Sequence, residues 1–244
     1  MNINIRGNLV DLSKPKVMGI LNLTPDSFYD GGKFNDLGKI ESHVSGMIKN
    51  GMDFLDIGGY SSRPGAKEIS ENDEISRIIK TLQFIRKKFP ELIISVDTFR
   101  SEVARVSLNE GADIINDISA GTMDNKMFET ISKYNCPYIL MHMKGNPKTM
   151  QQSPSYNDIV IEIIQFLAER IKVAHEFGIT DLIADPGFGF GKTTEHNFEI
   201  LNNLEKFLIL DLPILTGFSR KSMIYNTLKT DSENALNVTS CLNT

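Results

Sequence analysis

The chain has 244 residues and a formal net charge of −5, with 41% hydrophobic and 23% charged residues. This composition is typical of a soluble globular protein with a full core, and it argues against a surface that binds nucleic acid. The two cysteines, Cys136 and Cys241, exclude a disulfide framework and fit a reducing cytoplasm. Because no secretory leader pattern and no run of 18 apolar residues occur, we expect neither secretion nor a membrane span.

Seven short runs rich in Val, Ile and Leu are predicted to be buried strands. Each run is nearly continuous in apolar residues, which is typical of parallel strands that are covered on both faces. Their average spacing is about 33 residues, close to the length of a βαβ unit. In chain order they begin near residues 16, 53, 93, 112, 137, 181 and 213.

Helical patterns lie between several of these runs. Apolar residues at helical spacing predict a first helix over residues 40–48 and a second over residues 75–89, which Pro90 is expected to end. A third helix is predicted from Ile159 to Ala174, with Gly178 as its left-handed cap. The alternation of strands and helices favours an eightfold barrel or a doubly wound sheet.

Polar side chains at the carboxyl ends of the predicted strands distinguish these two folds. A doubly wound sheet gathers its site at one switch point, whereas a closed barrel brings every strand end to one mouth. A single Asp or Asn at such a place is more simply a turn residue or a helix cap, but the recurrence after all seven strands favours a TIM-type barrel. These residues are Asn22, Asp56, Asp97, Asn116, Asp117, His142, Asp185 and the run Ser219-Arg220-Lys221.

Three of these residues form a recognition set. The carboxylates of Asp97 and Asp185 and the amide of Asn116 can pair with a flat heterocycle that carries several N–H donors and acceptors. An acid/base pair or a metal site is the rival interpretation. We disfavour a metal hydrolase because the four histidines are scattered and no two of them are four residues apart.

Cationic residues accompany this set and indicate an anionic substrate or leaving group. Arg63 lies in a Ser/Pro/Gly loop and could hold a phosphate, although a solvated surface loop is the simpler alternative. Arg220 and Lys221 follow the last predicted strand. The loop over residues 22–34 is too long for a minimal turn and contains glycines, so we expect a lid that closes over the ligand.

The segment Asp185–Lys192, with sequence DPGFGFGK, combines three glycines with Phe188 and Phe190. Glycines allow the backbone to approach a ligand closely, and aromatic faces can pack against a ring. For one of the two Phe residues we expect only that it seals the rim of the core. A dinucleotide-binding interpretation of the glycines is weak, because no acidic residue follows about 20 positions later at a second strand end.

Seven ordered segments lie between about residues 17 and 224: MGILNLTPDSFYDGG, DIGGYSSRPGA, SVDTFRSEVA, GADIINDISAG, YILMHMKGNP, DPGFGFGKTTEHN and PILTGFSRKSMI. Together they resemble the dihydropteroate synthases, the sulfonamide targets of folate biosynthesis. The resemblance implies a TIM-type (β/α)8 barrel, with residues 1–244 as a single pterin-binding domain of a cytoplasmic transferase. The enzyme would join 6-hydroxymethyl-7,8-dihydropterin diphosphate to p-aminobenzoate, release pyrophosphate and form 7,8-dihydropteroate with Mg²⁺.

The resemblance also implies roles for single residues. Arg63 and Lys221 would be catalytic, because departure of a diphosphate needs stabilisation of charge more than it needs a base. Asn22 would contact Mg²⁺ and the diphosphate, as a neutral oxygen ligand that a pyrophosphate complements. The substrate-binding residues would be Asp97, Asn116, Asp185 and Lys221 for the pterin, Ser62 and Arg63 for the diphosphate and the amine, and Phe190, Arg220 and Ser222 for p-aminobenzoate.

The sequence departs from the family pattern in three places. Tyr60 replaces a Glu that many relatives have, and Ser62 replaces a Thr. At Thr244 the chain stops, where the family continues into an eighth strand with an Arg-x-His anion site. We therefore expect seven visible βα units with unpaired edges, and weakened or no activity for these 244 residues in comparison with a longer parent chain.

Two alternatives remain beside the synthase. A pterin-dependent methyltransferase barrel would share the Asp/Asn/Asp wall, but SRKS and SSRPGA favour the synthase because they serve p-aminobenzoate and diphosphate. A non-catalytic or truncated pterin-binding module would bind the pterin without turnover. In either case the expected partners are small molecules rather than nucleic acid or membrane, and a homodimer, common in the family, is one possible assembly.

Overall fold

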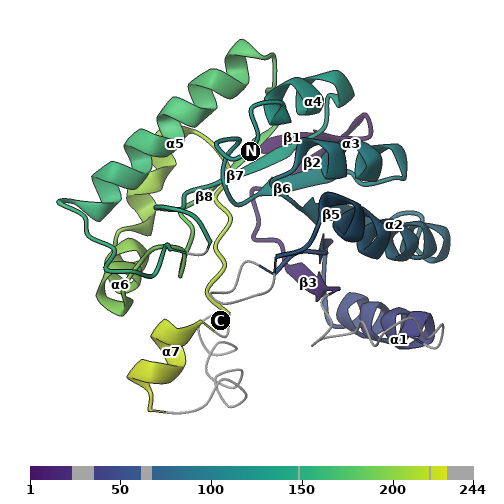
Figure 1. Cartoon of the computed structure of the whole chain (residues 1–244), viewed down its shortest axis with the longest axis horizontal. Coiled ribbons are helices and arrows are strands. Elements are labelled where there is room, and N and C mark those ends of the chain that lie inside the picture. Colours follow the sequence, from purple (N-terminus) through teal and green to yellow (C-terminus); the bar gives the residue numbers. More distant parts are fainter. Residues whose placement is uncertain (24–35, 62–67, 148, 220, 230–244) are drawn as a thin grey trace.

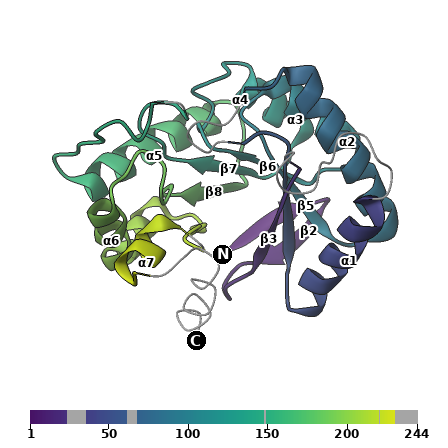
Figure 2. The same ribbon diagram turned by 60° about the horizontal axis from the view of Figure 1, so that its bottom comes forward.

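The computed structural model describes residues 1–23, 36–61, 68–147, 149–219 and 221–229. Its centre is a six-stranded parallel sheet in which neighbouring strands follow one another in chain order (Figure 1). The curved sheet has the alternating helices on its outside (Figure 2). The strands are β3 (Met18–Asn22), β4 (Phe54–Gly58), β5 (Ile93–Asp97), β6 (Ile114–Asp117), β7 (Tyr138–Met141) and β8 (Leu182–Asp185).

Helices connect these strands and continue after the last one. The predicted helices over residues 40–48, 75–89 and 159–174 are confirmed as α1, α2 and α5, and Gly178 has the expected left-handed backbone, with φ of 79°. Ser70 caps the start of α2 by accepting a hydrogen bond from the backbone N–H of Asp73 at 3.1 Å. The helices are α1 (Asp36–Lys49), α2 (Glu71–Lys88), α3 (Ser101–Asn109), α4 (Met127–Tyr134), α5 (Ile159–Glu176), α6 (Thr194–Asn202), the 3-10 helix η1 (Leu204–Leu210) and α7 (Ser222–Thr227).

The seventh predicted strand, beginning at residue 213, forms only a single parallel bridge between Ile214 and Ala184 of β8. The backbone N–H of Ala184 donates to Pro213 at 2.9 Å, and that of Leu215 donates to Ala184 at 2.9 Å. Pro213 has no N–H to extend this pairing. Within the described residues β3 pairs with β4 alone, and the inward-facing Ile20 is 59% exposed.

Side chains alternate between the two faces of the strands, as in any pleated sheet. Residues such as Leu55, Ile94 and Leu140 face the helices and belong to the largest apolar core. Phe54, Ile114, Ile139 and Ile183 face inward and form a second, smaller core at the amino-terminal end of the sheet. The polar residues of the candidate site therefore lie above an apolar floor.

A hairpin that the sequence analysis did not anticipate completes this floor. Strands β1 (Asn2–Ile5) and β2 (Asn8–Asp11) pair antiparallel (Figure 1). Ile3 and Ile5 pack into the second core. Arg6 and Gly7 form the turn with φ of 51° and 79°, the left-handed conformations that a two-residue hairpin of this type requires. Arg6 donates to both carboxylate oxygens of the buried Asp113, which ties the hairpin to the sheet.

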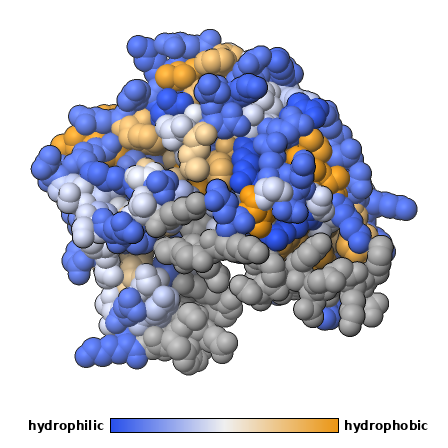
Figure 3. All heavy atoms as spheres, in the orientation of Figure 1, coloured by the Kyte–Doolittle hydropathy of each residue, from blue (hydrophilic) through white to orange (hydrophobic). Residues whose placement is uncertain are grey.

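The surface is mostly hydrophilic on the face that Figure 3 shows, with small apolar groups between polar ones. None of the helices that the structure describes is both long and apolar enough to cross a membrane.

Candidate active site

Four consecutive strands place one residue each in a row at their carboxyl ends. The register pairs Asn22 with Gly58, Gly58 with Asp97, and Asp97 with Asn116. A Cβ atom on Gly58 would lie 3.3 Å from Asn22 Oδ1 and 3.5 Å from Asp97 Oδ2. The absence of a side chain at position 58 thus lets these two oxygens converge from either side.

Asp56 lies below this row, two residues before Gly58 on the same face of β4. The side-chain amide of Asn116 donates to Asp56 Oδ2 at 3.0 Å, and this orients the amide. Oδ1 of Asp56 is buried and has no hydrogen-bond partner among the described residues. Burial raises the pKa of the Asp56 carboxyl, and the hydrogen bond from Asn116 opposes this shift.

Asp97 contributes a carboxyl group to the row. Burial raises its pKa well above the ordinary value, and the nearby carboxylates of Asp56, Glu74 and Asp117 raise it further, while Lys221 lowers it. Several buried or half-buried acids close together favour a protonated carboxyl or a ligand that brings N–H donors. A ring with adjacent N–H groups meets that requirement.

Asp185 ends β8 and faces the same space. Its Oδ1 accepts the backbone N–H of Gly187 at 2.7 Å. Burial raises the pKa of Asp185 to about 6, against the opposing effects of Gly187, Lys221 and Lys192. Since Lys221 lowers the pKa of both Asp97 and Asp185, its charge acts on both sides of the site.

The two Phe residues of the loop after β8 have different surroundings. Phe188 is 1% exposed and packs in the largest core, edge-on to Phe218, so it is the residue that seals the core. Phe190 is half-buried, and Lys221 Nζ lies 4.5 Å from the centroid of its ring. Phe190 also joins an apolar rim at the carboxyl ends of the strands, formed with Tyr60, Phe99, Ile118, Met141, Met143 and Met150.

The structure brings together most of the predicted site residues that it describes. Asn22, Asp97 and Asn116 form the row, and Asp185 and Lys221 lie opposite with Phe190. Ser222 is exposed as the first residue of α7. The predicted Ser62, Arg63 and Arg220, and the lid over residues 24–34, lie outside the described residues.

Two residues of the site were not among the predicted ones. Asp56 was recognisable only as a polar residue at a strand end, and its bond to Asn116 depends on the register of β4 and β6. Lys192 follows the glycine loop and is 4% exposed, although a Lys in a glycine-rich segment normally indicates a solvated side chain. Asp56 and Lys192 can be recognised as parts of the site only from their contacts in the folded structure.

The oxygen atoms at this site fit a magnesium ion that has few ligands from the protein itself. Among the described residues, no group of three or more His, Cys, Asp or Glu side chains could enclose a metal ion. Mg²⁺ keeps several waters and is commonly bound by one or two protein oxygens together with substrate phosphates. The half-buried Asn22 offers such an oxygen beside Asp97 Oδ2.

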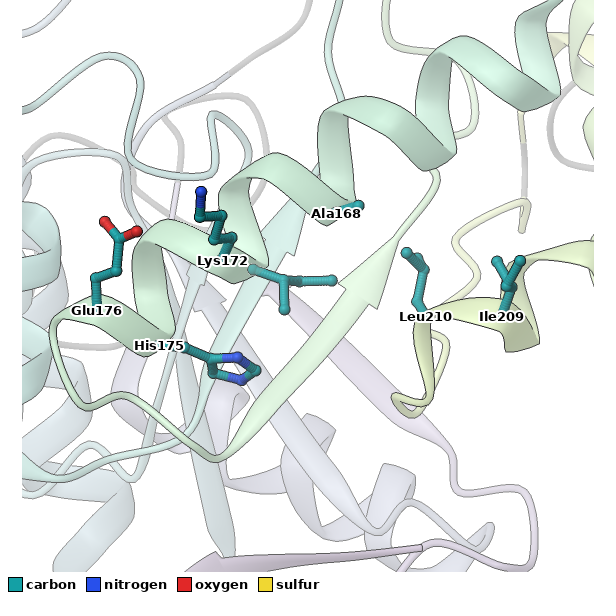
Figure 4. A pocket seen from close by; sticks show the side chains of 7 residues that line it. Ala168, Lys172, His175, Glu176, Ile209 and Leu210 are labelled. Atoms are coloured by element: carbon teal, nitrogen blue, oxygen red, sulfur yellow. The ribbon is translucent and has the colours of Figure 1, made fainter.

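A pocket elsewhere on the molecule lies between α5 and η1 (Figure 4). It lies on the outside of the sheet, away from the carboxyl ends of the strands, and does not include any residue of the row. The residues that line it are Ala168, Ile171, Lys172, His175, Glu176, Ile209 and Leu210.

Comparison with known proteins agrees with this geometry. Residues 18–243 match the family model described as pterin binding enzyme. The dihydropteroate synthase of Escherichia coli strain K12 is 46% identical over 226 residues, which cover 92% of this chain and 79% of that protein.

Two solved structures are also similar along most of their length. A dihydropteroate synthase of Yersinia pestis, with a sulfonamide drug complex, superposes with a TM-score of 0.89 at 40% identity, covering 97% of this chain and 85% of that one. A dihydropteroate synthase of Xanthomonas albilineans with 4-aminobenzoic acid gives a TM-score of 0.88 at 37% identity, with the same coverage. The fold is that of the TIM-type synthase barrels, and this chain belongs to the dihydropteroate synthases, the transferases of folate biosynthesis in the pterin-binding family.

Proposed function

We propose that this chain joins 6-hydroxymethyl-7,8-dihydropterin diphosphate to p-aminobenzoate with the residues that converge at the carboxyl ends of its strands. The observation that carries the proposal is the row of Asn22, Asp97 and Asn116 facing Asp185 and Lys221. Acidic and amide groups that recognise a ring, next to a cation that can meet a phosphate, suit a pterin with a diphosphate leaving group.

The pterin is held by hydrogen bonds from three strands. Asp185 is expected to accept N–H groups of the ring as a carboxylate, since a pKa of about 6 leaves it ionised at neutral pH. Asp97 and Asn116 bind the opposite edge, and Asp56 holds the Asn116 amide in orientation. The apolar floor and rim exclude water from the face of the ring.

The transfer step forms a C–N bond and breaks a C–O bond. The amine nitrogen of p-aminobenzoate attacks the methylene carbon attached to the pterin, the diphosphate leaves with the bonding electron pair, and the nitrogen then loses one proton to solvent. Lys221 and Arg63 stabilise the negative charge that develops on the leaving oxygen, and Ser62 orients the diphosphate and the amine. An arylamine is neutral at pH 7, so no base has to deprotonate it before the attack.

The aminobenzoate is proposed to lie over Phe190, close to the first turn of α7. There Ser222 can bind its carboxylate, with Arg220 supplying charge. The Xanthomonas albilineans synthase described with 4-aminobenzoic acid supports this choice of second substrate.

Magnesium is the proposed cofactor, with Asn22 as its protein contact and the diphosphate oxygens as its other ligands. When bound, it would neutralise charge on the diphosphate. We further propose that residues 1–244 act as one barrel domain in the cytoplasm, and that the protein assembles as a homodimer.

The proposal is tested by measuring 7,8-dihydropteroate directly, by chromatography, in the wild type and in Lys221→Met. Loss of the cation should lower kcat/KM about 100-fold, as removal of one stabilising group in a transition state commonly does. Lys172→Met is the matched control, because Lys172 is exposed on α5. Pterin binding without any product in the wild type would instead support the non-catalytic module.

A further inference from the structure

The loop that carries Phe190 packs directly on the backbone after β7. Gly187, Gly189 and Gly191 all have left-handed conformations, with φ of 73°, 80° and 63°. A Cβ at Gly187 would lie 2.0 Å from the carbonyl oxygen of His142, and one at Gly191 would lie 2.6 Å from that of Lys144. Only glycine allows this approach. The approach buries carbonyl groups that then need hydrogen-bond donors.

Lys192 supplies those donors from the end of the loop. Its Nζ donates to the carbonyl oxygens of Gly187 at 2.8 Å, Phe190 at 2.9 Å and His142 at 3.2 Å. It also lies 3.0 Å from the ring nitrogen Nδ1 of His142. The side chain is 4% exposed, and its nitrogen lies among three carbonyl oxygens and one imidazole nitrogen. Burial lowers the pKa of Lys192 to about 7, although the nearby Asp185 raises it. Burying an ionisable group is unfavourable unless it gains such partners, which makes an incidental placement a poor explanation.

His142 is uncharged in this arrangement. Burial, together with the charges of Lys192 and Lys144, lowers the pKa of His142 to about 2, so the ring is neutral. Its plane is edge-on to Phe166 at a centroid distance of 5.0 Å, which holds the ring in place. The side-chain nitrogen of Lys192 therefore connects the glycine loop to a rigid point at the end of β7.

The loop in turn orients two groups of the site. The N–H of Gly187 donates to Asp185 Oδ1 at 2.7 Å, and Phe190 lies under Lys221 Nζ at 4.5 Å. Gly189 is also close to Lys221, since a Cβ there would be 3.1 Å from Lys221 Cδ. A shift of residues 187–190 would move the Asp185 hydrogen bond, the Phe190 ring and the space for Lys221 together.

We propose that Lys192 is a positioning residue of the transferase: the hydrogen bonds of its buried side-chain nitrogen fix the loop over residues 187–191 and so align Asp185 and Phe190 with the two substrates. This inference rests on the proposed function for its effect on catalysis, whereas the order of the loop can be measured without substrate.

The experiment compares Lys192→Met with the wild type and with Lys172→Met, which makes the same substitution at the exposed lysine of α5. Amide hydrogen exchange without substrate is expected to rise at residues 187–191 in Lys192→Met only. Because misplaced groups slow transfer strongly, kcat per folded molecule should fall at least about tenfold and KM for p-aminobenzoate should rise. A protein that only loses stability would keep both values per folded molecule.

If Lys192→Met does not fold, Lys192→Gln is used in its place, because the Gln amide can still donate two hydrogen bonds. Intermediate loop exchange and intermediate kcat are expected for it. Unchanged loop exchange with unchanged kcat and KM, in whichever variant folds, would overturn the proposal. A wild type without turnover would overturn the proposed function and the catalytic part of this inference, while the exchange data would still decide whether Lys192 holds the loop.

Discussion

The side-chain amide of Asn116 donates to Asp56 Oδ2 at 3.0 Å, across β5 from one strand to the next but one. Through this bond Asp56, which need not touch the ligand itself, sets the orientation of the Asn116 amide that is proposed to bind the pterin. We expect Asp56→Ala to weaken pterin binding about tenfold, a loss typical of one hydrogen bond that is left unmade. Asp56→Asn keeps an acceptor for Asn116 and should stay within about threefold. Calorimetry with the pterin diphosphate measures both, and equal weakening in the two variants would argue against an orienting role.

Asp97 is proposed to bind the pterin, and its ionisation is expected to destabilise the fold. Its pKa is raised by burial and by Asp56, Glu74 and Asp117, so its contribution to stability is full below the ordinary value of 3.8 and is lost as the pH rises toward its folded pKa. Asp97→Asn removes this titration. We expect the variant to be more stable than the wild type, by a difference that grows as the pH rises from about 3.8 toward the folded pKa of Asp97, and to lose pterin affinity. Thermal melting across this range provides the measurement, and a constant or falling difference would contradict it.

Asp185 should make pterin binding depend on pH. Its pKa of about 6 in the free protein means that the carboxylate needed to accept ring N–H groups is protonated below that pH. Affinity for a pterin ligand that does not itself titrate in this range should therefore fall from pH 7 to pH 5, by at most about tenfold per pH unit. In Asp185→Asn this part of the pH dependence should disappear. If the variant keeps the wild-type profile, another group is responsible.

Glu74 and Arg100 form a buried ion pair behind the site. Glu74 is 0% exposed and accepts from Arg100 Nη1 and from the hydroxyl of Thr98, each at 2.7 Å, while Arg100 Nη2 donates to the carbonyl of Ile69 at 2.9 Å. Arg100→Met leaves the carboxylate buried without its cation and should destabilise the fold by about 3 kcal/mol in urea unfolding. Adding Glu74→Gln should recover part of that loss. Additive effects of the two changes would show that the residues do not act as a pair.

Continuous apolar runs in the strands and apolar residues at helical spacing explain why most of the fold was predictable. The runs that became β3 to β8 are nearly continuous in Val, Ile and Leu, and the helices α2 and α5 carry clear end signals at Pro90 and Gly178. The hairpin of β1 and β2 was missed because two of the four residues in each strand are Asn or Asp, so neither strand is a continuous apolar run. The apolar run at residue 213 predicted a full strand, whereas it forms a single bridge to β8 within the described residues.

Part of the candidate site could be predicted from residue type and from position at the end of a strand. Asp97, Asn116 and Asp185 lie at the carboxyl ends of strands, and a parallel sheet brings such positions to one edge. Lys221 follows the segment that bridges to β8 at Ile214. The roles of Asp56 and Lys192 were not predictable in this way. Both depend on contacts across the sheet and between loops, and neither residue type at that position indicates burial.

Joining of the amine and the pterin diphosphate in a single transfer is tested most directly by the stoichiometry of pyrophosphate release with Mg²⁺, the pterin diphosphate and p-aminobenzoate. We predict one pyrophosphate for each 7,8-dihydropteroate, and release that stops when p-aminobenzoate is omitted. Pyrophosphate release that continues at the same rate without the amine, or binding of the pterin with no release at all, would contradict it.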